Sequence, residues 1–175
     1  MKPVVIGIAC LGFIIVVALA GVGLGSMPQK TSPGDYLRLH IRANSNSPAD
    51  QEVKYHVRQA IVDQLTPIFH DVESKEQAMY RLRDNLGLVE RIARDTLKAR
   101  GFNYGARVAI KSEHFPTRAY TTSDTQITLP EGVYDALIME LGDGEGDNWW
   151  SVIYPPLCFS GEAGIRYKFK LTEYK

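Results

Sequence analysis

The hydrophobic residues of this chain change period twice, and this change limits the folds that it can adopt. In "YLRLHIRA", residues 36–43, apolar Leu37, Leu39 and Ile41 alternate with polar side chains, which predicts a half-buried strand. Helical spacing follows over residues 48–100, and period two returns after Gly101. One strand, then helices, then several strands predicts an α+β fold: a mixed or mainly antiparallel sheet with two to three helices packed on one face.

The helical part carries start and stop signals. Ser47 and Pro48 predict an N-cap and a first helical residue, and this helix is expected to end near Leu65. Ser74 to Gln77 is a capping box for a second helix. The segment from Asn85 to Gly87 predicts a break or bend, and Gly101 predicts the end of the helical part. The expected buried stripes are Val53, Val57, Ala60, Ile61 and Leu65 in the first helix and Val89, Ile92, Ala93 and Leu97 in the last. The expected later strands are residues 106–113, 118–122, 126–129, 133–142, 149–154 and 164–174.

The start of the chain has a different character. Residues 3–28 carry no charge, and Val4 to Leu24 is almost wholly apolar. Such a run is a secretory signal or a membrane anchor, because its 21 residues at about 1.5 Å each also cross a ~30 Å hydrocarbon core. We therefore expect an N-terminal hydrophobic helix in residues 1–25, a linker over 26–35, and a single extracytoplasmic domain over 36–175.

Composition and motifs exclude several functions. The formal net charge is zero, which argues against nucleic-acid binding. Cys158 is the only cysteine after the leader, so the domain cannot rest on an internal disulfide, and its apolar neighbours predict an inert thiol. The sequence contains no serine-hydrolase elbow, no aspartic-protease motif and no zinc-ligand spacing among its histidines. We expect no enzyme activity, no metal and no cofactor.

The stretch "GDGEGD", residues 142–147, resembles the opening of a calcium loop. An EF-hand that began at Asp143 would need glycine at position 148 and an acid at position 154, where this chain has Asn148 and Tyr154. The simpler interpretation is a tight glycine turn between strands with its acids in solvent.

Polar residues gather where the first strand meets the first helix. His40, Arg42 and Asn44 project from one side of the strand, and Ser45, Asp50, Gln51 and Lys54 follow them. The free N–H groups of a helix N-terminus favour an anion or a peptide carboxylate there. The alternative is a turn whose asparagine and serine side chains bond to their own backbone.

Two aromatic segments, "HFPTRAY" and "NWWSVIYPPLCF", are typical both of partner-binding surfaces and of irregular core segments. Trp149 and Trp150 are adjacent, so in an extended chain they face opposite ways. Pro155 and Pro156 lack backbone donors and are expected to end a strand ladder.

These blocks resemble stage II sporulation protein R of endospore-forming bacteria. The matching segments are "LRLHIRANSNSPADQEVKYHVRQAI", "HFPTRAY", "LPEGVYDALIMELGDGEGDNWW" and "PPLCF", over roughly residues 37–160. The partner-binding or motif residues that the resemblance implies are His40, Arg42, Asn44, Ser45, Asp50, Gln51, Lys54, Phe115, Pro116, Arg118, Tyr120, Asn148, Trp149, Trp150, Pro155 and Pro156. Many relatives have cysteine where this chain has Ser151, so a bridge from that position to Cys158 is impossible here.

The resemblance implies a signalling role. Such proteins are exported from the forespore to the intermembrane space, either secreted or anchored in the membrane by one N-terminal span. There they activate a membrane-embedded aspartic protease, stage II sporulation protein GA, which then processes pro-sigma-E. The alternative function is a cell-envelope hydrolase or glycan-binding protein, with His40 and Asp50 as acid–base groups and Trp149 or Trp150 as a sugar platform. That alternative requires these groups to converge in one cleft.

Overall fold

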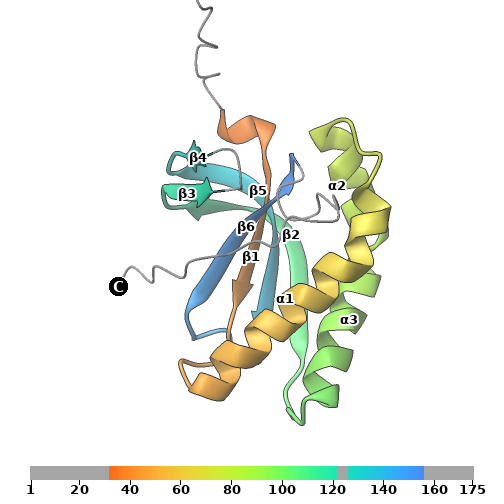
Figure 1. Ribbon diagram of the computed structural model, residues 1–175, viewed down its shortest axis with the longest axis vertical. Helices are drawn as coiled ribbons and strands as arrows, with labels where there is room; N and C mark the ends of the chain where they lie inside the picture. The colour runs from red at the N-terminus through yellow and green to blue at the C-terminus, as the bar shows by residue number, and fades with distance from the viewer. Residues whose placement is uncertain (1–31, 122–125, 156–175) are drawn as a thin grey trace, which may run out of the picture. The chain divides into compact units, whose positions relative to one another are not determined.

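Four strands form one mixed sheet in the computed structural model, which describes residues 32–121 and 126–155. The strand order is β2-β5-β1-β6, in which β1 is parallel to β5, and the pairs β1–β6 and β2–β5 are antiparallel. The strands β3 and β4 form a separate hairpin (Figure 1). The bounds are β1 Leu37–Arg42, β2 Ala106–Phe115, β3 Arg118–Thr121, β4 Gln126–Leu129, β5 Gly132–Leu141 and β6 Asn148–Tyr154, and a short 3-10 helix, η1, spans Pro33–Asp35 before β1.

Three helices lie between β1 and β2 in the chain and cover one face of the sheet (Figure 1). They are α1 Pro48–Phe69, α2 Lys75–Asp84 and α3 Leu86–Ala99. The predicted signals hold: Ser47 caps α1, Ser74 caps α2, and the break between α2 and α3 falls at Asn85. Gly101 follows α3 with a φ of 83°, a conformation that favours glycine.

Three details of the helices differ from the prediction. The helix α1 continues past Leu65 to Phe69, although Pro67 lies inside it. Pro67 removes one backbone bond near the helix end, while Phe69 is almost completely buried, so packing outweighs the lost bond. Ala60 and Ile92 are half-buried rather than buried. In α2 the Gln77 side chain accepts from the backbone N–H of Glu73, one residue before the cap, instead of that of Ser74.

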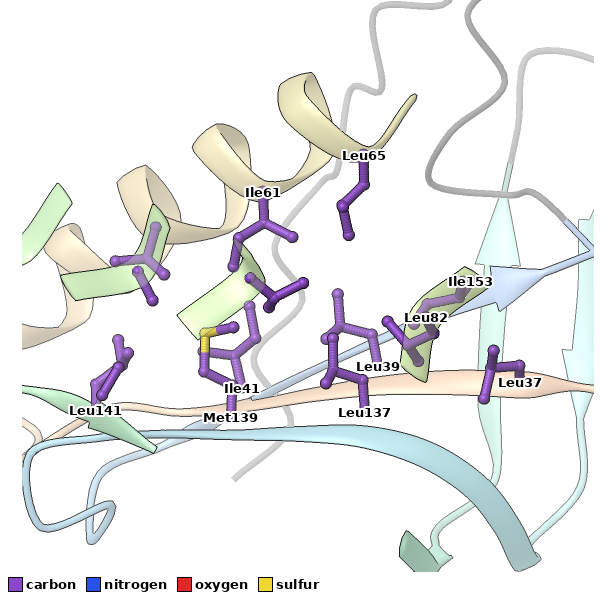
Figure 2. Packing of buried hydrophobic residues seen from close by; sticks show 14 of the residues in the cluster. Leu37, Leu39, Ile41, Ile61, Leu65, Leu82, Leu137, Met139, Leu141 and Ile153 are labelled. Atoms are coloured by element: carbon purple, nitrogen blue, oxygen red, sulfur yellow. The ribbon is translucent and has the colours of Figure 1, made fainter. Parts of the chain in front are cut away.

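The main core fills the space between the helices and the sheet. Figure 2 shows Ile61 and Leu65 of α1 pointing toward the strands, where Leu39 and Ile41 of β1 lie beside Leu137 and Met139 of β5. The alternation predicted for β1 thus places its apolar residues under the helices. Leu39 has no exposed surface, and truncation of such a leucine to alanine typically costs about 2–5 kcal/mol.

The opposite face of the sheet is also covered, so the prediction of a half-buried β1 is wrong. We call this face the hairpin face, because the β3–β4 hairpin packs on it through Tyr120, Ile127 and Leu129. Beneath the hairpin lie Tyr36, Phe115, Tyr134, Ala136, Ile138 and Val152. The polar side of β1 therefore becomes interior: Arg38 has no exposed surface, and His40 is 4% exposed.

The α+β class, with a mixed sheet and three helices on one face, is confirmed. The expected N-terminal hydrophobic helix, Pro156, Cys158 and the expected strand at 164–174 lie outside the described residues. Within residues 32–121 and 126–155, no helix combines the length and the apolar composition that a membrane crossing requires.

Candidate partner-binding site

The turn after β1 and the glycine loop before β6 are bound to each other. The N–H groups of Glu145 and Gly146 donate to the carbonyls of Asn44 and Ala43, at 3.2 and 2.8 Å. The side chain of Asn44 also accepts from the N–H of Asp143 at 3.0 Å. A Cβ atom at position 146 would overlap the Ser45 carbonyl, so the close approach of the two loops requires glycine there.

The same loop shows why its other glycines are present. Gly142 and Gly144 have φ angles of 58° and 71°, in the left-handed region. The side chains of Asp143, Glu145 and Asp147 are exposed, as a solvated glycine turn predicts.

The carboxylate of Asp50 lies at the start of α1, where the sequence suggested an anion. Its oxygens accept hydrogen bonds from Ser45 Oγ at 2.5 Å, Tyr104 OH at 2.5 Å and Asn44 Nδ2 at 2.9 Å. Burial raises the pKa of Asp50, but the hydrogen bonds from Ser45, Tyr104 and Asn44 outweigh it, so the pKa lies below its ordinary value. The protein itself therefore supplies the negative charge at this helix N-terminus.

Gln51 and Lys54 extend this arrangement across to the glycine loop. Gln51 Nε2 donates to the Ser45 carbonyl at 2.9 Å, and Lys54 Nζ donates to Gln51 Oε1 at 2.7 Å and to the Asp147 carbonyl at 3.0 Å. Lys54 is only 2% exposed. Five predicted site residues thus join α1, the turn after β1 and the glycine loop into one hydrogen-bonded corner. They are Asn44, Ser45, Asp50, Gln51 and Lys54.

A second group of predicted residues meets on the hairpin face. His40 Nε2 donates to Asn148 Oδ1 at 2.7 Å, and His40 Nδ1 lies 3.2 Å from Glu113 Oε1. Arg42 forms ion pairs with Glu113 and, at 2.7 Å, with Glu140. Burial lowers the pKa of His40 below its ordinary value, although the hydrogen bond to Asn148 and the charge of Glu113 oppose that shift.

Arg38 is the buried cation of this face, and sequence reasoning did not select it. Its Nε donates to the Ser151 carbonyl at 3.1 Å, and its Nη2 donates to Tyr120 OH at 2.5 Å. The guanidinium lies 4.5 Å from the ring centre of Phe115 and 4.8 Å from that of Tyr134. Arg38, His40 and Arg42 are spaced two residues apart, so they lie on the same side of β1. This spacing is the signal in the sequence that could have identified Arg38 as a site residue. No such signal pointed to Glu113.

The two tryptophans face opposite sides of the sheet, as predicted. Trp149 packs against the helix-side core, with the Arg58 guanidinium 5.3 Å from its ring centre. Trp150 stacks on His40 at 5.3 Å with an interplanar angle of 22°, and the guanidinium of Arg118 lies 4.2 Å above it. Both tryptophans are half-buried.

The predicted residues therefore fall into separate places. The hairpin face collects His40, Arg42, Phe115, Arg118, Tyr120, Asn148 and Trp150, and the corner at α1 collects the five residues named above. Pro116 lies half-buried between β2 and β3, and Pro155 is exposed directly after β6.

This arrangement does not suit His40 and Asp50 as the acid–base pair of a hydrolase. His40 belongs to the hairpin face and Asp50 to the corner at α1, and the two share no partner within the described residues. Both are almost completely buried and engaged in hydrogen bonds. Among residues 32–121 and 126–155, no three histidine, cysteine, aspartate or glutamate side chains are grouped to hold a metal ion.

Comparison with known proteins gives a consistent result. The family model described as Stage II sporulation protein R matches residues 33–163, which include both groups of site residues. Stage II sporulation protein R of Bacillus subtilis (strain 168) is 35% identical over 173 residues, covering 93% of this chain and 75% of that protein. No solved structure matches. This chain therefore belongs to the stage II sporulation protein R family.

Proposed function

We propose that this protein is a sporulation signal that activates a membrane-embedded aspartic protease, stage II sporulation protein GA, for the processing of pro-sigma-E. In this proposal it is exported from the forespore to the intermembrane space, where it is secreted or held by one N-terminal membrane span. It acts by contact with the extracytoplasmic part of the protease and not by chemistry of its own.

Family membership is the observation that carries this proposal. The structure adds support of a physical kind. Within each of the two site clusters, the polar side chains are mostly held by hydrogen bonds and ion pairs to one another, an arrangement that suits a preformed binding surface. Binding activates a protease only if the bound protein favours the active state over the inactive one, and a rigid partner can supply that difference.

The test is reconstitution in a bacterium that does not sporulate. Full-length protein, the protease and tagged pro-sigma-E are co-expressed, and precursor cleavage is followed by immunoblot. We expect cleavage to rise when this protein is present and exported. A chain that lacks residues 1–25 serves as the matched control, because it stays in the cytoplasm and is expected to give no activation.

Two further controls define the result. Replacement of the catalytic aspartate of the protease by asparagine should abolish cleavage of pro-sigma-E in every strain. If the exported chain leaves cleavage at the level seen without it, the proposed function is wrong. If the cytoplasmic chain activates equally well, the extracytoplasmic contact is wrong.

A further inference from the structure

Arg118, the first residue of β3, has its guanidinium over the ring of Trp150. Its guanidinium carbon lies 4.2 Å from the ring centre, which is the distance of a stacked cation–π contact. A guanidinium that stacks on an aromatic ring uses its planar face and keeps the N–H groups at its edge for other partners. Those N–H groups can bind a carboxylate with two parallel hydrogen bonds.

The edge of Arg118 carries an unused donor. Its Nε is buried and has no hydrogen-bond partner in the part of the chain that the structure describes. Arg42, Arg81 and Arg94 each form an ion pair with at least one carboxylate, whereas no carboxylate lies within 4.0 Å of Arg118 in that part. A buried N–H without an acceptor costs about 1–3 kcal/mol. Because the Arg118 residue as a whole is only half-buried, a partner carboxylate can approach its guanidinium and supply the missing acceptor.

The platform under Arg118 is fixed before any partner arrives. Trp150 is stacked on His40, and the His40 ring meets Phe115 edge-on at 5.8 Å. His40 is in turn held by Asn148. The position of the Arg118 guanidinium is therefore set by contacts that reach from the hairpin into the sheet. Little conformational entropy of the Arg118 side chain is lost when a partner binds.

We propose that Arg118, on the Trp150 platform, binds an aspartate or glutamate side chain on the extracytoplasmic part of the membrane protease. This inference rests on the proposed function and adds the place of contact and the chemistry of the partner group. Two observations select a partner acid. The N–H donors of Arg118 match the two oxygens of a carboxylate. Arginine and tryptophan are also among the residue types that contribute most binding energy at protein interfaces.

The test uses the cleavage reconstitution with full-length variants at limiting expression. Arg118→Gln is expected to lower activation at least tenfold, Arg118→Glu further, and Arg118→Lys to give an intermediate loss, because lysine keeps the charge without the paired donors. The matched control is Arg91→Gln on α3, an exposed arginine on the helical side of the domain, which should activate like the natural chain.

A charge exchange identifies the partner group. In the presence of Arg118→Glu, each extracytoplasmic acid of the protease is changed to lysine, and one such change should restore cleavage. Near-UV circular dichroism and the urea midpoint of the purified variants check that the Trp150 stack and the fold persist. Arg118→Lys keeps the test decisive if the glutamate variant does not fold.

Each other outcome overturns the inference. If the natural chain activates and Arg118→Gln activates equally, the contact is wrong while the proposed function stands. If the natural chain does not activate the protease, both the Arg118 contact and the proposed function are wrong. If no protease acid restores cleavage, the proposed partner carboxylate is wrong. If Asp124→Asn, Glu162→Gln or Glu173→Gln alone reproduces the loss, Arg118 instead forms an ion pair within this chain.

Discussion

Glycine in the loop before β6 is required by close packing against the turn after β1. Gly146→Ala would place a Cβ against the Ser45 carbonyl, and we expect it to lower the free energy of unfolding by about 2 kcal/mol or more. Gly87, in the first turn of α3, has open space around a new Cβ. Gly87→Ala should therefore be neutral or stabilise by up to about 1 kcal/mol, because alanine favours helix.

Urea unfolding of the two variants, followed by far-UV circular dichroism, measures this difference. Equal midpoints for Gly146→Ala and the natural chain would show that the two loops are not packed as described.

Asp50 makes stability depend on pH in a defined direction. Its pKa is lowered in the folded protein, so its contribution is complete above the unfolded value near 3.9 and is lost as the pH falls through the folded value. We expect Asp50→Asn to be less stable than the natural chain by about 2 kcal/mol at pH 7, because the charged acceptor of three hydrogen bonds is lost.

Urea titrations from pH 7 to pH 3 test this prediction. The difference in stability between the two chains should narrow below about pH 4, because Asp50 of the natural chain binds a proton in the unfolded state before it does so in the folded state. Asp95→Asn, on the exposed side of α3, is the control and should follow the natural chain at every pH. A gap that stays constant down to pH 3 would contradict the role of the Asp50 charge.

At the scale of elements, the β3–β4 hairpin is tied to the sheet through a buried arginine. Tyr120→Phe removes the hydroxyl that accepts from Arg38 Nη2, while Arg38 Nη1 already has no hydrogen-bond partner among the described residues. We expect a loss of about 1–3 kcal/mol in the free energy of unfolding, since a buried cation then lacks another acceptor.

Tyr80→Phe is the matched control. Tyr80 lies on α2 with 71% of its surface exposed, so the same chemical change there should alter stability by less than about 0.5 kcal/mol. Hydrogen exchange of the β3 and β4 amides gives a second readout and should accelerate only in Tyr120→Phe. Indistinguishable results for the two variants would mean that Arg38 does not hold the hairpin.

The ends of elements show what local sequence signals can specify. The start of α1 was predictable because Ser47 and Pro48 act within one turn of chain. Its end was not, because Phe69 gains its burial from strands and helices far away in the sequence. Pro67 is a local stop signal that tertiary packing overrides.

At the scale of the whole molecule, the core of the described part is built from one continuous stretch of the chain. Every buried hydrophobic residue there lies between Tyr36 and Ile153, and Thr31–Lys175 forms one compact unit. We expect a chain that begins at Thr31 to unfold in a single transition with the same urea midpoint as the full chain. Fluorescence of Trp149 and Trp150 and far-UV circular dichroism should give coincident curves; a lower midpoint or separated curves would contradict this expectation.

The sequence by itself determined the types of the main helices and strands in the described part of the chain, the side of β1 that faces the helices, the glycine turn and the family. These features depend on residues within a few positions of one another, or on motifs that can be recognised directly in the sequence. The tertiary structure decided the rest: that the hairpin buries the polar side of β1, that Glu113 reaches His40 and Arg42, and that Arg118 lies on Trp150. These contacts join strands separated by dozens of residues, and no local pattern of hydrophobicity encodes which distant side chain completes a buried charge.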